Sequence, residues 1–148
     1  MPAEVKYGYL YGPRCMIKAW PIAASVVFTN TGGKFTLLDA NDRIAIAVAG
    51  DLQLDGWVEV GAYTSSATAG LDTADVDVSY LSVFRVPANG SPANTRGETA
   101  DLIVASNIQK VNQAASSTDV VKIMDLDTTD TTVDVMMNPT KMFTAGVA

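Results

Sequence analysis

The sequence contains no histidine and only one cysteine among its 148 residues. Without histidine there is no imidazole to act as a general base, to activate a serine or cysteine nucleophile, or to ligate zinc. The single cysteine, Cys15, cannot form an intrachain disulfide or a cysteine-based zinc site. These absences exclude the commonest hydrolytic and zinc-dependent chemistries, and we interpret Cys15 as a small, buried apolar residue.

Charged residues and long apolar runs are also scarce. Asp, Glu, Lys and Arg make up 18% of the chain, and the net charge is −6 with a pI near 4.4. An acidic protein repels phosphate backbones, so we expect no nucleic-acid partner. No run approaches the roughly 20 apolar residues that span a bilayer, and the N-terminus lacks the apolar core of a signal peptide. We therefore expect no membrane association, and a protein that is made and used without secretion.

Alternation of apolar and polar residues dominates the sequence, which is typical of half-buried β-strands. In RIAIAVA, for example, Ile44, Ile46 and Val48 are predicted to face the core together. Turn signals recur about every ten residues, as in all-β sandwiches and barrels. The strands are predicted at residues 5–11, 25–30, 34–39, 43–49, 57–63, 76–86 (one strand or two), 101–106, 119–124 and 131–137.

The remaining segments predict little helix and two long loops. The best helical candidate is 111–121, and its Ser and Thr residues make it a poor helix. Residues 63–75 and 87–98 are small, polar or rich in Pro and Gly, and are predicted to be loops. We expect a single all-β domain of β-sandwich or β-tulip type, with an N-terminal arm or first strand at 1–24, a β-rich body at 25–148 and at most one short helix.

Aromatic residues are concentrated near the N-terminus, where Tyr7, Tyr9 and Tyr11 are predicted to share one face of an extended segment and Trp20 follows. Such a segment is either a first strand packed on the core or an arm that anchors on a neighbouring molecule. The predicted interface residues combine this segment with the loop at 87–98; they are Tyr7, Tyr9, Tyr11, Arg14, Trp20, Asn89 and Arg96.

Asp125, Asp127 and Asp130 form the cluster that most resembles a metal site. Counted from Asp125, an EF-hand loop would need Gly where Asp130 stands and Glu where Met136 stands, so the EF-hand pattern fails. A looser calcium site stays open, but Asp and Thr also suit the connection of a β-hairpin, because their side chains bond nearby backbone groups. We favour the hairpin and expect no metal and no cofactor.

Asp72, Asp75 and Asp77 form a second acidic cluster. Paired carboxylates serve glycoside hydrolysis when they flank a bond at a fixed separation. A solvated loop leading into an edge strand explains these residues more simply, since outward acids also discourage strand-to-strand aggregation. We therefore predict that the chain is not an enzyme.

The order of segments over residues 30–140 resembles capsid decoration, or cement, proteins of tailed bacteriophages. TGGKFTLLDANDRIAIAVAGD and GWVEVGAY come first. A strand ending in VFRVPANG then leads to the Gly-x-x-x-Asp-Leu step of GETADL, and a hairpin ending in Val-Asp-Val closes on Asn-Pro in TTVDVMMNP. The resemblance implies a non-catalytic protein on the outer face of the virion head, assembled in the host cytoplasm.

The resemblance also implies the partners: the major capsid protein, whose subunits it would bridge, and further copies of itself, as a homotrimer or alternatively a dimer. A second hypothesis is a receptor- or glycan-binding β-module of a virion fibre or tail. Its platform would be Trp57, Tyr63 or Tyr80, provided that these rings are exposed.

Overall fold

The computed structural model describes residues 7–29, 33–92, 96–105, 108–114 and 117–142. In these ranges the regular structure is β-strand apart from one 3-10 turn, η1(Pro139–Lys141). The all-β fold with at most one short helix is thus confirmed. The strands are β1(Gly8–Tyr11), β2(Met16–Pro21), β3(Val27–Phe28), β4(Lys34–Leu38), β5(Ile44–Ile46), β6(Gly56–Val58), β7(Tyr63–Thr64), β8(Thr73–Asp77), β9(Val83–Pro87), β10(Thr99–Ala105), β11(Ile108–Asn112), β12(Val121–Asp127) and β13(Thr132–Met137).

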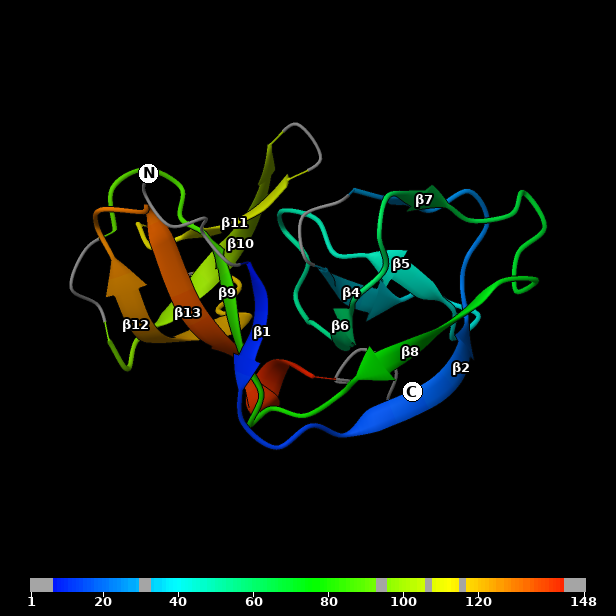
Figure 1. Cartoon of the computed structure of the whole chain (residues 1–148), viewed down its shortest axis with the longest axis horizontal. Helices are drawn as coiled ribbons and strands as arrows, with labels where there is room; N and C mark the ends of the chain where they lie inside the picture. The colour runs from blue at the N-terminus through cyan, green and yellow to red at the C-terminus, as the bar shows by residue number, and fades with distance from the viewer. Residues whose placement is uncertain (1–6, 30–32, 93–95, 106–107, 115–116, 143–148) are drawn as a thin grey trace.

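The strands form two large antiparallel sheets and one small one. The order is β1-β9-β13-β12-β10-β11 in the first sheet, β2-β8-β6-β4-β5 in the second, and β3 pairs with β7. Figure 1 shows the two large sheets side by side. Both sheets curl, because residues at their far ends are bridged. Ala88, the residue after β9, forms an isolated β-bridge with Val111 of β11. Ile22, the residue after β2, forms one with Ile44 of β5.

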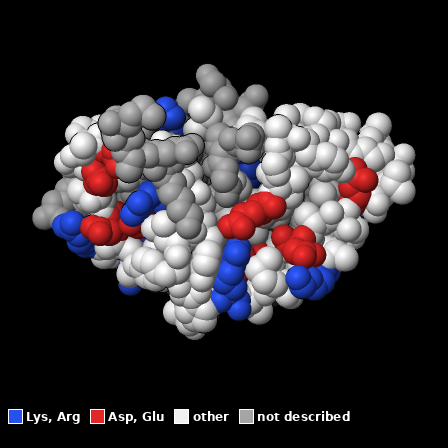
Figure 2. Space-filling view, viewed as in Figure 1, with Lys and Arg blue, Asp and Glu red and all other residues white. Residues whose placement is uncertain are grey.

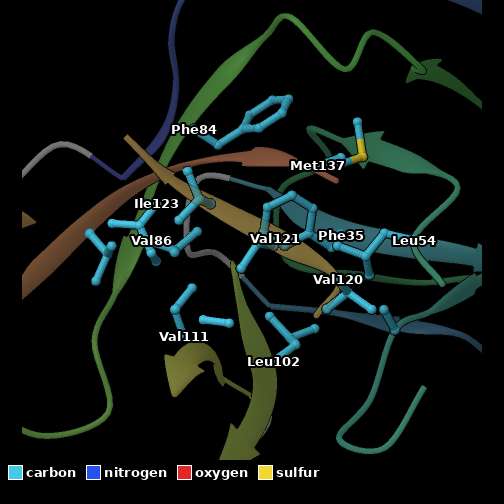
Figure 3. Close-up of a cluster of buried hydrophobic side chains, with 14 of the residues drawn as sticks. Phe35, Leu54, Phe84, Val86, Leu102, Val111, Val120, Val121, Ile123 and Met137 are labelled. Atoms are coloured by element: carbon cyan, nitrogen blue, oxygen red, sulfur yellow. The ribbon is translucent and has the colours of Figure 1, made fainter. Parts of the chain in front are cut away.

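One hydrophobic core joins the two large sheets (Figure 3). At its centre the Trp57 ring of β6 stacks on Phe84 of β9 with centroids 4.5 Å apart, and Phe35 of β4 meets both rings edge-on. Aromatic pairs in these geometries add to the stabilisation from burial. Because these rings come from both sheets, neither sheet can be lifted away without opening the core.

Most of the predicted strands exist, but several are shorter than the alternation suggests. The segment 76–86 contributes to two strands, β8 and β9, and residues 121–137 form the β12–β13 hairpin. The strand predicted at 43–49 ends at Ile46. Ala47 then turns inward and its N–H donates to the Phe35 carbonyl, while Val48 is 49% exposed, so the prediction that Val48 faces the core is wrong.

The segment 111–121, the best but weak helical candidate in the sequence, is not helical where the structure describes it. Residues 111 and 112 end β11, and Val121 begins β12. Tertiary pairing with β10 overrides the weak local preference of this segment. Within the described part of the chain, no helix is long and apolar enough to cross a membrane.

The N-terminal segment contributes an edge strand to each large sheet. β1 pairs with β9, and β2, which the alternation did not predict, pairs with β8. The β1 pairing shifts register between Tyr9 and Tyr11, so the two rings do not share an environment: Tyr9 is half-buried and Tyr11 is 55% exposed. Because β2 covers β8, the prediction that Asp72, Asp75 and Asp77 lead into an edge strand is wrong as well.

Candidate functional site

Two connections that join the large sheets lie side by side. The chain passes from β1 to β2 through residues 12–15 and returns from β8 to β9 through residues 78–82 (Figure 1). Val78 N–H donates to the Cys15 carbonyl at 2.9 Å, and the Ser79 and Ser82 hydroxyls both donate to the Pro13 carbonyl. These bonds hold the two connections as one unit.

Gly12 permits this close approach. Its φ is +104°, and a Cβ at this position would lie 2.2 Å from the Leu81 carbonyl oxygen. Only glycine combines that backbone conformation with the absence of a side chain. The backbone at Leu81 is therefore set directly against the β1–β2 connection.

Asp77 and Arg14 fix the connections from inside. The buried Asp77 carboxylate accepts from the N–H groups of Cys15 and Ser79, and from Arg14 Nε at 3.0 Å. The Arg14 guanidinium also lies 4.1 Å from the centroid of the Tyr9 ring. A buried carboxylate satisfied in this way rigidifies its surroundings.

The two connections and the strand ends beside them carry an exposed apolar surface, which we call the crossover surface. Half of the ten large apolar side chains that are exposed in the described residues lie here, on segments 11–17 and 76–83. They are Tyr11 (55% exposed), Met16 (37%), Ile17 (41%), Tyr80 (50%) and Leu81 (47%). Apolar side chains exposed this close together along two neighbouring segments suit a contact surface.

The charges around the crossover surface are paired. Lys18 Nζ lies 3.1 Å from Asp75 Oδ2, and Arg14 reaches Glu59 at 3.5 Å besides Asp77. The Ala19 N–H and the Lys18 ammonium lower the pKa of Asp75. Figure 2 shows basic side chains directly beside acidic ones on this face. A partner therefore meets an apolar surface with little net charge, although the whole chain is acidic.

The structure brings together three of the seven predicted interface residues, Tyr9, Tyr11 and Arg14. Tyr7 instead lies near the end of β9, in a cavity that Pro87 and Lys110 also line. At the end of β2, the Trp20 indole N–H donates to the Asp42 carbonyl.

The other two predicted interface residues lie on the connection between β9 and β10. Asn89 is exposed, and its N–H donates to the Val111 carbonyl. Arg96 donates to Asp125 Oδ1 at 2.8 Å. The Leu126 N–H and the Arg96 guanidinium together lower the pKa of Asp125.

Cys15 belongs to the crossover surface, and its predicted burial is wrong. Its side chain is exposed because residue 15 lies in the connection outside both sheets. The chain has no histidine to activate this thiol, so we assign it no chemistry. The crossover surface is suited to non-covalent contact.

The acidic clusters are used for local structure. Asp127 accepts from the N–H groups of Thr129 and Asp130 within the β12–β13 turn, which confirms the hairpin. Asp72 accepts from Tyr63 and from the Ser66 N–H. Among the described residues, no three Cys, Asp or Glu side chains are placed to hold a metal ion.

Sequence reasoning missed Met16, Ile17 and Leu81, and it named Tyr80 only as part of a glycan platform. A signal was present in SYLS, within the strand or strands predicted at 76–86, because two adjacent large apolar residues cannot both face the core from one strand. Conversely, Trp57 was considered as a glycan platform, but only 1% of it is exposed, so it cannot stack on a sugar. Tyr63 and Tyr80 are 38% and 50% exposed.

Comparison with protein-family models, curated proteins and solved structures finds no match to this chain. The family resemblance drawn from the sequence therefore stays a prediction.

Proposed function

We propose that this chain is a structural virion protein that binds the outer surface of a bacteriophage capsid and stabilises the head by bridging major capsid protein subunits. The observation that supports the proposal most is the crossover surface: apolar, nearly neutral and held rigid by Asp77 and Gly12. A rigid contact surface loses little conformational entropy on binding.

The proposed role requires only modest affinity from each contact. A decoration protein occupies many equivalent positions on a shell, and contacts from several linked copies sum to a large total. We propose that the chain acts as a homotrimer, with a dimer as the alternative, because closed symmetry lets each copy contact equivalent capsid sites. The extended segment from β1 to β2 would lie at the capsid contact.

The test is co-sedimentation with purified heads of the phage whose genome encodes the chain. The double variant Tyr80→Ser/Leu81→Ser should bind at least tenfold more weakly, because each buried apolar side chain contributes about 1.5–3 kcal/mol and 1.4 kcal/mol is tenfold. The matched control is Leu71→Ser, which removes a 68% exposed leucine outside the crossover surface. Equal binding of the double variant and the wild type would assign the contact to another surface.

The second candidate is a receptor- or glycan-binding module, favoured by the exposed rings of Tyr63 and Tyr80. Tyr63 stacks on Phe28 and bonds to Asp72, so its ring is held in place. Retention of the protein on a carbohydrate column would support this function instead, provided that Tyr63→Ala loses the retention and that the protein does not bind capsids. Imaging of heads with and without the protein distinguishes the two, since only a decoration protein adds density on the outer face.

A further inference from the structure

Asparagine followed by glycine occurs once in the sequence, at Asn89–Gly90, on the connection between β9 and β10. The side-chain amide carbon of an asparagine can be attacked by the backbone nitrogen of the residue that follows it. Glycine hinders this attack least, because it has no Cβ and a permissive backbone. Whether the reaction takes place in a folded chain depends on how the fold holds the two residues.

Asn89 and Gly90 are both exposed, and their reacting groups are free. The Asn89 backbone N–H donates to the Val111 carbonyl at 2.9 Å, which ties the start of the connection to β11. Among the described residues, neither the Asn89 side-chain amide nor the Gly90 N–H takes part in a hydrogen bond. The amide carbon and the nitrogen that must meet are thus not held apart by other contacts.

The backbone at Gly90 has room to move. Its φ is +84°, and a Cβ at this position would meet no heavy atom within 4 Å. The residue is therefore not glycine because of close packing, as it is at Gly12. Its backbone can rotate while the nitrogen approaches the Asn89 side chain, and solvent reaches both groups.

The pair Asp55–Gly56 could undergo the corresponding reaction of aspartate, and the fold protects it. Asp55 is buried, and its Oδ2 accepts from the Leu38 N–H at 2.9 Å and from Gln53 Nε2 at 2.7 Å. Gly56 begins β6, and a Cβ there would lie 2.3 Å from Val76 Cγ1. Both the carboxylate and the backbone are therefore fixed, in contrast to the Asn89–Gly90 pair.

The three other asparagines that the structure describes also lack the freedom of Asn89. After Asn41, the N–H of the next residue bonds to the Asp39 carbonyl. The Asn112 side chain accepts from the Ala114 N–H. Asn138 is followed by proline, whose nitrogen carries no proton to lose. Reactivity is thus concentrated at one asparagine of the described chain.

We propose that Asn89 deamidates spontaneously in the folded protein, so that the chain acquires a carboxylate at this position as it ages. The Gly90 nitrogen gives its proton to hydroxide and forms a bond to Asn89 Cγ. The side-chain nitrogen takes a proton from water and leaves as ammonia, which restores the hydroxide. Water then opens the cyclic imide at either carbonyl and leaves aspartate or isoaspartate at position 89.

Either product adds one negative charge to a chain whose net charge is −6. The new charge lies beyond the Pro87 end of β9, whereas the crossover surface adjoins the Val83 end of the same strand. The proposal therefore does not depend on capsid binding.

The test is to keep the full chain at physiological temperature in neutral buffer, with a parallel sample unfolded in urea. Isoelectric focusing separates the acidic product, and peptide mapping by mass spectrometry locates it. In the folded sample Asn89 should convert at least tenfold faster than Asn41, at roughly its rate in urea, and isoaspartate should form at Asp55 only in urea. Conversion of Asn89 no faster than that of Asn41, or at least tenfold slower in the folded chain than in urea, would overturn the proposal.

Gly90→Ala should slow the conversion of Asn89 at least tenfold, because a Cβ crowds the attacking nitrogen and restricts the backbone. The matched control is Gly50→Ala, which makes the same change at another open glycine with φ +87° and should leave the Asn89 rate unchanged. Asn89→Asp should migrate with the acidic product of the wild type in isoelectric focusing. Conversion of Asn89 at the wild-type rate in Gly90→Ala would also overturn the proposal.

Discussion

At the scale of single residues, aspartate side chains hold the backbone in place by accepting hydrogen bonds from its N–H groups. Asp77 accepts from the N–H groups of Cys15 and Ser79 in the two connections, and Asp55 accepts from the Leu38 N–H. Asp101 accepts from the N–H groups of Ser117, Thr118 and Asp119, which precede β12 in the chain. An acidic composition is therefore compatible with a folded interior, because the buried carboxylates of Asp55 and Asp77 serve as hydrogen-bond acceptors.

Asp101→Asn should lower the free energy of unfolding by about 1–2 kcal/mol at pH 7, since bonds to a charged acceptor are worth more than neutral ones and the site is partly exposed. Urea unfolding measures the loss. The control is Asp130→Asn, which removes the same charge from an exposed turn and should change stability by less than about 0.5 kcal/mol.

Asp101 also predicts that the free energy of unfolding depends on pH. Burial alone would raise the pKa of Asp101, but its backbone N–H donors outweigh burial and lower the pKa below 3.8. The stabilisation is complete above the unfolded-state pKa and is lost as pH falls through the native one. The stability difference between wild type and Asp101→Asn should therefore shrink between about pH 5 and pH 2, and a constant difference would contradict this origin.

Lys34 predicts a second pH dependence of stability, in the alkaline range. Its pKa is lowered from 10.5 by burial, so between the native pKa and 10.5 the unfolded chain binds more protons than the folded one. Stability attributable to Lys34 then rises with pH across that window. The wild type should gain stability relative to Lys34→Met as pH is raised from 7 towards 10.5, measured by urea unfolding in parallel. A flat difference would show that the ammonium is as well solvated in the fold as outside it.

At the scale of elements, the edge strand β1 is held in the body by its pairing with β9 and by an aromatic contact. The Tyr9 ring meets Phe84 edge-on with centroids 6.2 Å apart, and its hydroxyl donates to the Gly12 carbonyl. The neighbouring Tyr11 is 55% exposed. The two tyrosines of one short strand thus have separate roles, one in the core and one on the surface.

Tyr9→Ala should cost about 2–3 kcal/mol of unfolding free energy, because it removes a half-buried ring from the edge of the core. Tyr11→Ala should cost less than about 0.5 kcal/mol and should weaken capsid binding. Thermal unfolding and co-sedimentation of both variants measure the two effects. If Tyr9→Ala were as stable as Tyr11→Ala, the segment would be an arm rather than a strand of the body.

At the same scale, the Gln109 side-chain amide provides hydrogen bonds between β11 and β4, two strands that do not pair with each other. Gln109→Leu should destabilise the protein by about 2–4 kcal/mol, because it leaves the buried Phe35 N–H without its acceptor and two carbonyls with fewer donors. The control, Lys110→Leu on the same strand, should cost less than about 1 kcal/mol. Chemical denaturation of the pair provides the comparison.

At the scale of the whole molecule, the two sheets should unfold together. Phe35 and Trp57 of the second sheet pack against Phe84 of the first in one shared cluster, although the second sheet also has a smaller cluster around Ile44, Val58 and Val76. Trp57 fluorescence, isolated by a Trp20→Phe substitution, should change at the same urea concentration as the far-ultraviolet circular dichroism signal. Two separated transitions would show that the sheets are independently stable units.

Sequence periodicity predicted the all-β class and the positions of most strands, because alternating burial must produce a period of two in any sheet with one wet face. It did not predict β2, whose residues are mostly exposed, or β11, where tertiary pairing overrides weak local preferences. Three of the five apolar residues of the crossover surface, Met16, Ile17 and Leu81, were also not predictable from the sequence. Ile17 and Leu81 are ordinary apolar residues in sequence, and only the crossing of two connections exposes them together.

The sequence by itself determined the class of fold, the β12–β13 hairpin and the exclusion of histidine chemistry, since these depend on composition and on neighbours along the chain. The tertiary structure alone decided that Cys15 is exposed, that Trp57 is buried and that Lys34 lies against an apolar cavity. Each of these depends on which distant strand packs against the residue. Burial is a property of the assembled sheets, and a local pattern contains no information about the partner that produces it.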